Sequence, residues 1–206
     1  PPFPVLALQP AAEHSASIVN EFVTQAHQVL ADRYPANGIL LRGFSRLPVL
    51  PGYAELYGLR AAAIAVNGMY RGVARLAGMQ VLPVEGGSIA DEFACLEKHW
   101  PDFDFFYLHI KQTDTAGEKG DFDLKVRVIE EVDALLPRLL ALQPDVLIVS
   151  GDHSSPAVLK AHSWHPVPTL LFARHVRAEG VAEYGERACA RGSGGPRCVR
   201  FPGRAK

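Results

Sequence analysis

An aspartate and a histidine stand side by side where an apolar run ends, in the segment Val146-Leu147-Ile148-Val149-Ser150-Gly151-Asp152-His153. A carboxylate oxygen next to an imidazole nitrogen suits a divalent metal ion, because such ions accept both kinds of donor. The same side-chain types recur at Asp114 and Glu118, which follow another apolar run, and at His162 and His165. These residue types predict a metal site, and a dinuclear one if all of them converge.

The elements that must position these donors are two strands and a helix. Residues 104–110 and 145–149 are predicted to be strands covered on both faces, since they carry few charges. Between them a long helix is predicted from Asp121, its N-cap, to residue 140, with Pro137 kinking or dividing it. A strand, a helix and a strand in this order form a right-handed βαβ unit with parallel strands.

In a parallel sheet, the loops that follow the strands lie at one edge, where α/β proteins build their sites. One such loop is the polar stretch 111–120, and another follows residue 149. A third loop precedes a last predicted strand at residues 169–173. The side chains expected to converge at this edge are Asp114, Glu118, Asp152, His153, His162 and His165.

The rest of the chain also has the pattern of an α/β protein. Apolar residues recur at helical spacing over residues 11–30. Pro48, Pro51 and Gly52 predict a loop that separates two structural units, and the sequence from Arg187 on predicts a loose tail rich in Arg and Gly. The other predicted elements are helices at about 70–78 and 89–99 and strands at 39–41 and 61–66.

Composition narrows the class of protein. A hydrophobic fraction of 48% is ordinary for a globular protein with a core, and a net charge of −1 argues against nucleic acid or a membrane surface as the main partner. No apolar run reaches the length of a membrane span, and no signal peptide is recognised. Cys95, Cys189 and Cys198 have no metal-binding spacing and fit a reducing compartment, so we expect a cytoplasmic protein.

Several motifs together resemble the cofactor-independent phosphoglycerate mutases of the archaeal type, which belong to the alkaline phosphatase superfamily. The resemblance runs from about residue 11 to about residue 185. The motifs that carry it are Gly151-Asp152-His153-Ser154-Ser155-Pro156, His162-Ser163-Trp164-His165-Pro166-Val167-Pro168, His109-Ile110-Lys111-Gln112-Thr113-Asp114-Thr115-Ala116-Gly117-Glu118, Asn37-Gly38-Ile39-Leu40-Leu41-Arg42-Gly43 and Tyr57-Gly58-Leu59-Arg60.

The resemblance implies a partial three-layer alkaline-phosphatase-like core with a parallel sheet over residues 51–185. Residues 1–50 would be the end of an inserted, substrate-clamping α/β domain, and residues 186–206 an irregular tail. It also implies two divalent ions, usually Mn²⁺, with Mg²⁺ or Zn²⁺ in some relatives. Asp114, Glu118 and His162 would hold one ion, and Asp152 and His153 the other. His109, inside a predicted strand, and His165, beside the motif, would support the site without binding metal.

The reaction implied is the glycolytic interconversion of 3-phosphoglycerate and 2-phosphoglycerate through a phosphoserine. Arg42, Arg71 and Lys111 would bind the phosphate and carboxylate of this small substrate. The family's first strand, with its metal-binding aspartate, and its nucleophilic serine have no counterpart here. The chain therefore resembles the C-terminal part of the enzyme, contains no catalytic nucleophile, and is expected to be inactive alone.

Other functions stay open at this point. The chain is also compatible with a related phosphatase or phosphomutase that acts on another small phosphate ester. A non-catalytic metal-binding remnant is the alternative from a different class. The sequence does not decide the oligomeric state.

Overall fold

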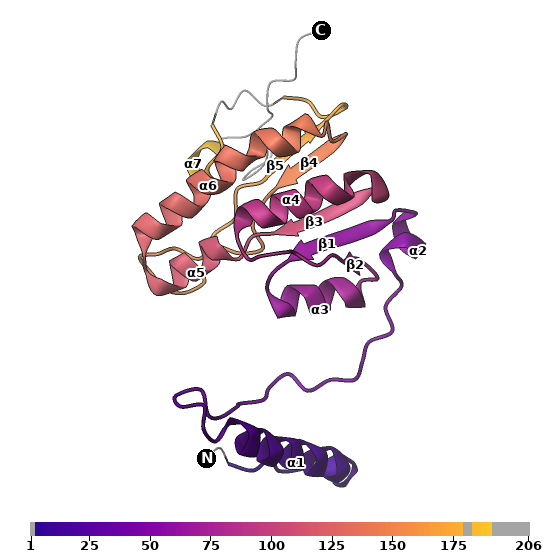
Figure 1. Cartoon of the computed structure of the whole chain (residues 1–206), viewed down its shortest axis with the longest axis vertical. Helices are drawn as coiled ribbons and strands as arrows, with labels where there is room; N and C mark the ends of the chain where they lie inside the picture. The colour runs from indigo at the N-terminus through magenta and orange to yellow at the C-terminus, as the bar shows by residue number, and fades with distance from the viewer. Residues whose placement is uncertain (1–2, 179–182, 191–206) are drawn as a thin grey trace. The chain divides into compact units, whose positions relative to one another are not determined.

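The computed structural model describes residues 3–178 and 183–190. The chain divides into two compact units, Pro1–Pro48 and Val49–Lys206, which are described separately (Figure 1). Most of the predicted tail lies outside the described residues, although its start forms the short helix α7 (Glu186–Cys189). That the first unit ends an inserted domain stays a prediction.

The first unit contains a 3₁₀ turn, η1 (Pro10–Ala12), and the helix α1 (Glu13–Leu30), which confirms the predicted helix. Asn20 fixes the preceding segment on this helix, since its side chain accepts from Val5 N at 2.8 Å and donates to Val5 O at 2.9 Å. The predicted strand at residues 39–41 is wrong. Residues 37–50 contain no strand, because no other described segment offers them a backbone ladder.

The second unit is built on a parallel sheet in the order β2-β1-β3. Its strands are β1 (Ala61–Ala65), β2 (Gln80–Val81) and β3 (Phe105–His109). The small, apolar residues of β1 are all buried, as expected for a central strand covered on both faces. The α/β class with a parallel sheet is therefore confirmed. The two longer strands pair in register from Ala61 with Phe105 to Ala65 with His109, so both end at one edge.

A second, two-stranded sheet pairs β4 (Val146–Val149) with β5 (Leu170–Ala173) in antiparallel fashion. The prediction that the strands at 104–110 and 145–149 belong to one sheet is wrong for the described residues, in which β3 pairs only with β1 and β4 only with β5. One face of β4 is correspondingly exposed to solvent, with Val146 55% and Ile148 60% exposed.

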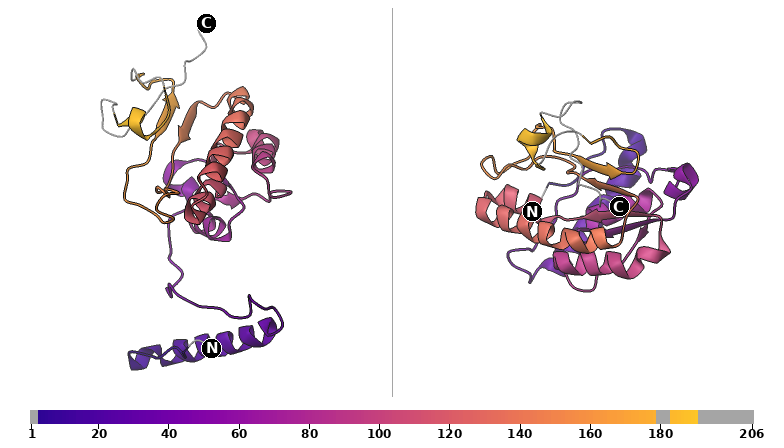
Figure 2. Two further views of the ribbon diagram at one scale, coloured as in Figure 1. Left: turned by 90° about the vertical axis from the view of Figure 1, so that its left-hand side faces the viewer. Right: turned by 90° about the horizontal axis from the view of Figure 1, so that it is seen from above.

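Helices α3 and α4 pack on the strands of the parallel sheet. α3 (Gly68–Leu76) follows β1, and α4 (Ile89–His99) precedes β3 through the turn η2 (Trp100–Asp102). α2 (Tyr53–Tyr57) begins the unit. α4 and α6 (Phe122–Ala141) lie side by side (Figure 2) and share a core cluster of Ile89, Phe93 and Val128. Among the residues described, each helix is too short or too polar to cross a bilayer.

Two features of the segment 111–141 differ from the predictions. The predicted loop 111–120 is largely the helix α5 (Gln112–Lys119), which Gly120 ends with a left-handed φ of 74°. The predicted helix after it begins as expected, since the Asp121 side chain accepts from Leu124 N at 2.8 Å. Pro137 does not divide α6, which is one continuous helix.

Glu92 is an unusual member of the core. It lies on α4 with no exposed surface, and neither of its carboxylate oxygens has a hydrogen-bond partner among the described residues. Burial raises its pKa from the ordinary 4.5 to about 7, because the charged form loses its hydration. The folded protein therefore holds a proton that the unfolded chain releases between these two pH values.

We predict that Glu92→Gln removes a pH dependence of stability. Because the folded pKa is the higher one, the free energy of unfolding of the wild type should fall as pH rises from 4.5 to about 7 and then level off. Above that pH the variant should be more stable by roughly 3 kcal/mol, the equivalent of that pKa shift. Urea unfolding at pH values of about 5 and about 8 measures the effect. Glu131→Gln, at an exposed position of α6, is the control and should keep the wild-type slope.

Candidate metal centre

The structure brings the five predicted metal ligands together. Asp114 is central, with its Oδ1 3.9 Å from His153 Nδ1 and 3.5 Å from His162 Nε2. His162 Nε2 lies 3.3 Å from Glu118 Oε1, and His153 Nε2 lies 3.6 Å from Asp152 Oδ2. One ligand atom each from Asp114, His153 and His162 fits within a group whose members are all within 4.8 Å of one another.

Helix α5 explains how two of these side chains reach the site. Asp114 and Glu118 are four positions apart, so a helix places them on one face a turn apart, where both meet His162. The sequence predicts a loop here because the segment has no apolar stripe. A helix holds the two carboxylates more rigidly than a loop would, because its backbone hydrogen bonds fix their relative position.

Ser155 joins the two halves of the site, and sequence reasoning missed it. Its hydroxyl contacts the Asp114 carboxylate and lies 3.2 Å from His153 Nδ1. Its carbonyl oxygen accepts a hydrogen bond from Lys125 Nζ at 2.6 Å. Gly117 on α5 lies against the same carbonyl group, so closely that a Cβ there would be 2.1 Å from the oxygen. A glycine inside a helix is the only sign in the sequence that another segment's backbone comes this close to α5.

A short bridge also fixes the loop that carries His162. Ser154 and Ser163 form an isolated antiparallel pair, in which Ser163 N donates to Ser154 O at 2.9 Å. The loop after β4 and the loop before β5 are thus held together at the point where their ligands emerge. The antiparallel pairing of β4 with β5 continues this arrangement.

The electrostatic surroundings keep the two aspartates charged. Burial alone would raise the pKa of Asp114, but hydrogen bonds from Lys111 and Ser155 outweigh it and hold the pKa below the ordinary value. Burial likewise opposes ionisation of Asp152, and the hydrogen bond from Tyr70 helps to lower its pKa. Both side chains therefore offer carboxylate oxygens at neutral pH, as divalent cations require.

The other predicted site residues occupy different surroundings. The Lys111 ammonium group contacts Asp114, and Arg71 follows Tyr70 in the first turn of α3. Arg42 belongs to the first unit, so its position relative to the metal ligands is not described. Their roles in substrate binding stay predictions.

The two supporting histidines also lie in different places. The ring of His109 stacks on Tyr70, and burial lowers its pKa, which favours the neutral form. His165 stacks on Trp164 and pairs through Nδ1 with Ser163 Oγ at 2.6 Å. His165 is not part of the group of three closely spaced ligands found among the described residues.

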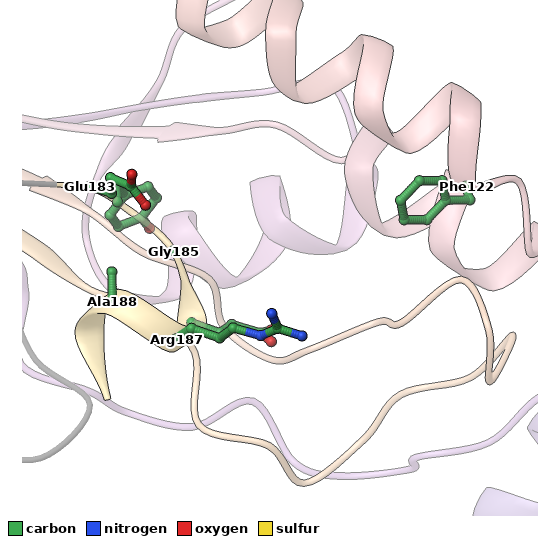
Figure 3. A pocket seen from close by; sticks show the side chains of 7 residues that line it. Phe122, Glu183, Gly185, Arg187 and Ala188 are labelled. Atoms are coloured by element: carbon green, nitrogen blue, oxygen red, sulfur yellow. The ribbon is translucent and has the colours of Figure 1, made fainter. Parts of the chain in front are cut away.

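A pocket is lined by other residues than these ligands. Phe122 and residues 183–188 line it (Figure 3). None of the predicted metal or substrate ligands is among its lining residues. The hydroxyl of Tyr184, one of the lining residues, lies within hydrogen-bond distance of two carbonyl oxygens, that of Pro168 at 3.0 Å and that of Val149 at 3.3 Å. It can donate its one proton to either, and so attaches this segment to the ends of β4 and β5.

The donor set fits a divalent ion. It combines carboxylate oxygens with imidazole nitrogens, a mixture that Mn²⁺ and Zn²⁺ accept readily and Mg²⁺ accepts through its oxygens. A family model described as the metalloenzyme superfamily matches residues 25–194. The chain belongs to the metalloenzyme superfamily. The number and identity of the ions stay predictions.

Curated relatives carry a more specific name. Proteins from Thermotoga neapolitana (50% identical over 186 residues) and Deinococcus radiodurans (48% over 198 residues) are both named probable 2,3-bisphosphoglycerate-independent phosphoglycerate mutase. The matches cover 90% and 95% of this chain but 46% and 48% of those proteins. The chain thus spans about half the length of these relatives, and the family resemblance seen in the sequence is confirmed.

Solved structures agree on the fold. The PH0037 protein from Pyrococcus horikoshii matches with a TM-score of 0.79 at 30% identity, over 93% of this chain and 55% of that one. A cofactor-independent phosphoglycerate mutase from Thermoplasma acidophilum matches with a TM-score of 0.61 at 24% identity, over 94% of this chain and 51% of that one. The second match supports the fold alone.

Proposed function

We propose that this chain is the metal-binding part of a phosphoglycerate mutase that interconverts 3-phosphoglycerate and 2-phosphoglycerate. The observation that carries the proposal is the group of metal donors around Asp114. It occurs in a chain that is 50% identical, over 186 residues, to a protein named as a probable phosphoglycerate mutase. Five side chains from three segments meet within ion-pair distance. The three carboxylates in this cluster lose hydration and repel one another, and a bound cation would offset that cost.

The proposed roles follow the geometry. Asp114, Glu118 and His162 hold one divalent ion, preferably Mn²⁺, and Asp152 and His153 hold a second. Ions held there would supply positive charge to neutralise phosphoryl oxygens and would lower the pKa of an attacking hydroxyl. Lys111 lies beside Asp114 and is proposed to bind a phosphate or carboxylate oxygen of the substrate. Arg71 and Arg42 are the further candidates for this role.

The nucleophile is proposed to come from polypeptide outside these 206 residues. Ser154 and Ser155 directly follow the ligand His153 in the sequence, and both are buried. Ser154 donates to His165 O at 3.4 Å, and the Ser155 hydroxyl is engaged by Asp114 and His153. Neither is free to attack a phosphoryl group, whereas the relatives contain about as much sequence again as the part matched here.

The metal-binding part of the proposal is tested with Asp114→Asn. We expect the chain to bind Mn²⁺ and the variant to bind it at least about 100-fold more weakly, because losing a ligand costs more than losing a residue behind one. Calorimetric titration with Mn²⁺ measures both affinities. Glu131→Gln, which removes an exposed carboxylate on α6, should leave the affinity unchanged. A wild-type chain that binds neither Mn²⁺, Mg²⁺ nor Zn²⁺ would contradict the proposed function.

A further inference from the structure

Tyr70 reaches the metal site from an element that carries none of the predicted metal ligands. It lies in the first turn of α3, directly after the end of β1. Because Ala65 of β1 pairs with His109 of β3, this turn is at the sheet edge that leads into the site. The Tyr70 hydroxyl donates a hydrogen bond to Asp152 Oδ2 at 2.8 Å, across 82 residues of sequence.

The Tyr70 side chain is fixed at both ends. Asn67 caps α3 by accepting from Met69 N at 3.0 Å, which sets the first turn of the helix. The Tyr70 ring stacks on the His109 imidazole, with centroids 3.5 Å apart and planes tilted by 25°. A ring held by a capped helix and by a stacked neighbour presents its hydroxyl at a defined point.

Asp152, by contrast, has little else to hold it. It lies in the loop after β4, and its side chain is 52% exposed. Its Oδ1 accepts only from the neighbouring backbone, His153 N at 3.1 Å, so the Tyr70 hydroxyl is its one hydrogen bond to a distant element in the described structure. Without that bond, the carboxylate would be free to sample other rotamers.

We propose that Tyr70 is a positioning residue that orients the Asp152 carboxylate for a divalent metal ion. A phenol suits this task because it donates one hydrogen bond and carries no charge, so it leaves lone pairs on the carboxylate and does not compete with the cation. The His109 ring, stacked on Tyr70, limits the movement of the phenol ring. The inference rests on the proposed function, since it assumes that Asp152 binds metal.

The test compares Tyr70→Phe with Tyr107→Phe. Tyr107 on β3 also lies near His109, with ring centroids 5.9 Å apart, but no hydrogen bond joins it to Asp152 in the described structure. The phenylalanine ring of the Y70F variant would keep the stack on His109 and lack only the hydroxyl. We expect Y70F to weaken Mn²⁺ binding by about 10- to 100-fold, as for residues that orient ligands, and Y107F to change it by less than about threefold.

The same substitution in a variant that lacks the Asp152 carboxylate distinguishes an effect on the position of Asp152 from a general loss of structure. If Tyr70 acts through Asp152, adding Y70F to Asp152→Ala should not weaken further the Mn²⁺ binding that remains. A further loss of affinity in the double variant would overturn the proposal, as would wild-type affinity in Y70F alone. Both results leave the proposed function intact, whereas a wild-type chain without Mn²⁺ affinity sinks the proposed function and this inference together.

Discussion

Gly117→Ala is expected to abolish tight metal binding and to destabilise the second unit by about 2–3 kcal/mol, the upper part of the range typical of overpacking. The added Cβ would lie 2.1 Å from the Ser155 carbonyl oxygen and 3.0 Å from the Ser155 Cβ. The first of these contacts is with backbone, so no side-chain rotation relieves it. Helix α5 must move away from the loop after β4, and Asp114 on the helix then separates from His153 on the loop.

The matched control for this substitution is Gly72→Ala. Gly72 also lies inside a helix, α3, but a Cβ there meets no atom within 4 Å. Alanine should therefore stabilise α3 by about 0.5–1 kcal/mol, as expected from its higher helix propensity. Urea unfolding and Mn²⁺ titration measure both variants. Wild-type stability and affinity in the Gly117 variant would show that the two segments do not pack as closely as described.

The ligands could be predicted from sequence because their chemistry is local. Asp152 and His153 are adjacent and stand at the end of an apolar run, and that alone identifies a donor pair at a strand end. Five predicted ligands lie together in the structure even though two predictions about their supporting elements were wrong. Which side chains can bind metal depends on residue type, whereas whether they meet depends on how their segments pack, as the close approach of Gly117 to Ser155 shows.

The elements that were missed lack the signals on which such predictions depend. Helix α5 is polar, with Ala116 and Gly117 as its buried residues, so it has no apolar stripe to reveal a helical period. The antiparallel pairing of β4 with β5 depends on the direction in which a loop returns, which residue patterns do not encode.

The supporting contacts were missed for a related reason. Ser155 and Tyr70 each reach a predicted ligand through one long-range hydrogen bond, to residues 41 and 82 positions away. One long-range contact leaves no periodicity in a sequence. Only the folded geometry identifies these two residues as part of the site.

Phosphoglycerate mutase activity is expected to be absent from this chain and present in a chimera with a relative. In the chimera, the stretch matched here replaces the matching half of the Thermotoga neapolitana protein, to which it is 50% identical. The half that remains would supply the nucleophile proposed to lie outside this chain. It would also have a place to dock, because β3 and β4 each have one unpaired edge in the described structure. A strand edge with unpaired backbone groups and half-exposed apolar side chains favours pairing with a further strand.

A coupled assay that detects 2-phosphoglycerate formed from 3-phosphoglycerate, in the presence of Mn²⁺, tests this prediction. The chain alone should give only the background rate, and the chimera should give turnover that Asp114→Asn in the same protein removes. Activity of the chain alone would refute the assignment of the nucleophile to another part of the protein. An inactive chimera that binds Mn²⁺ as tightly as the relative would instead favour a related phosphatase or phosphomutase, because the metal site would then be intact while the substrate or nucleophile did not match.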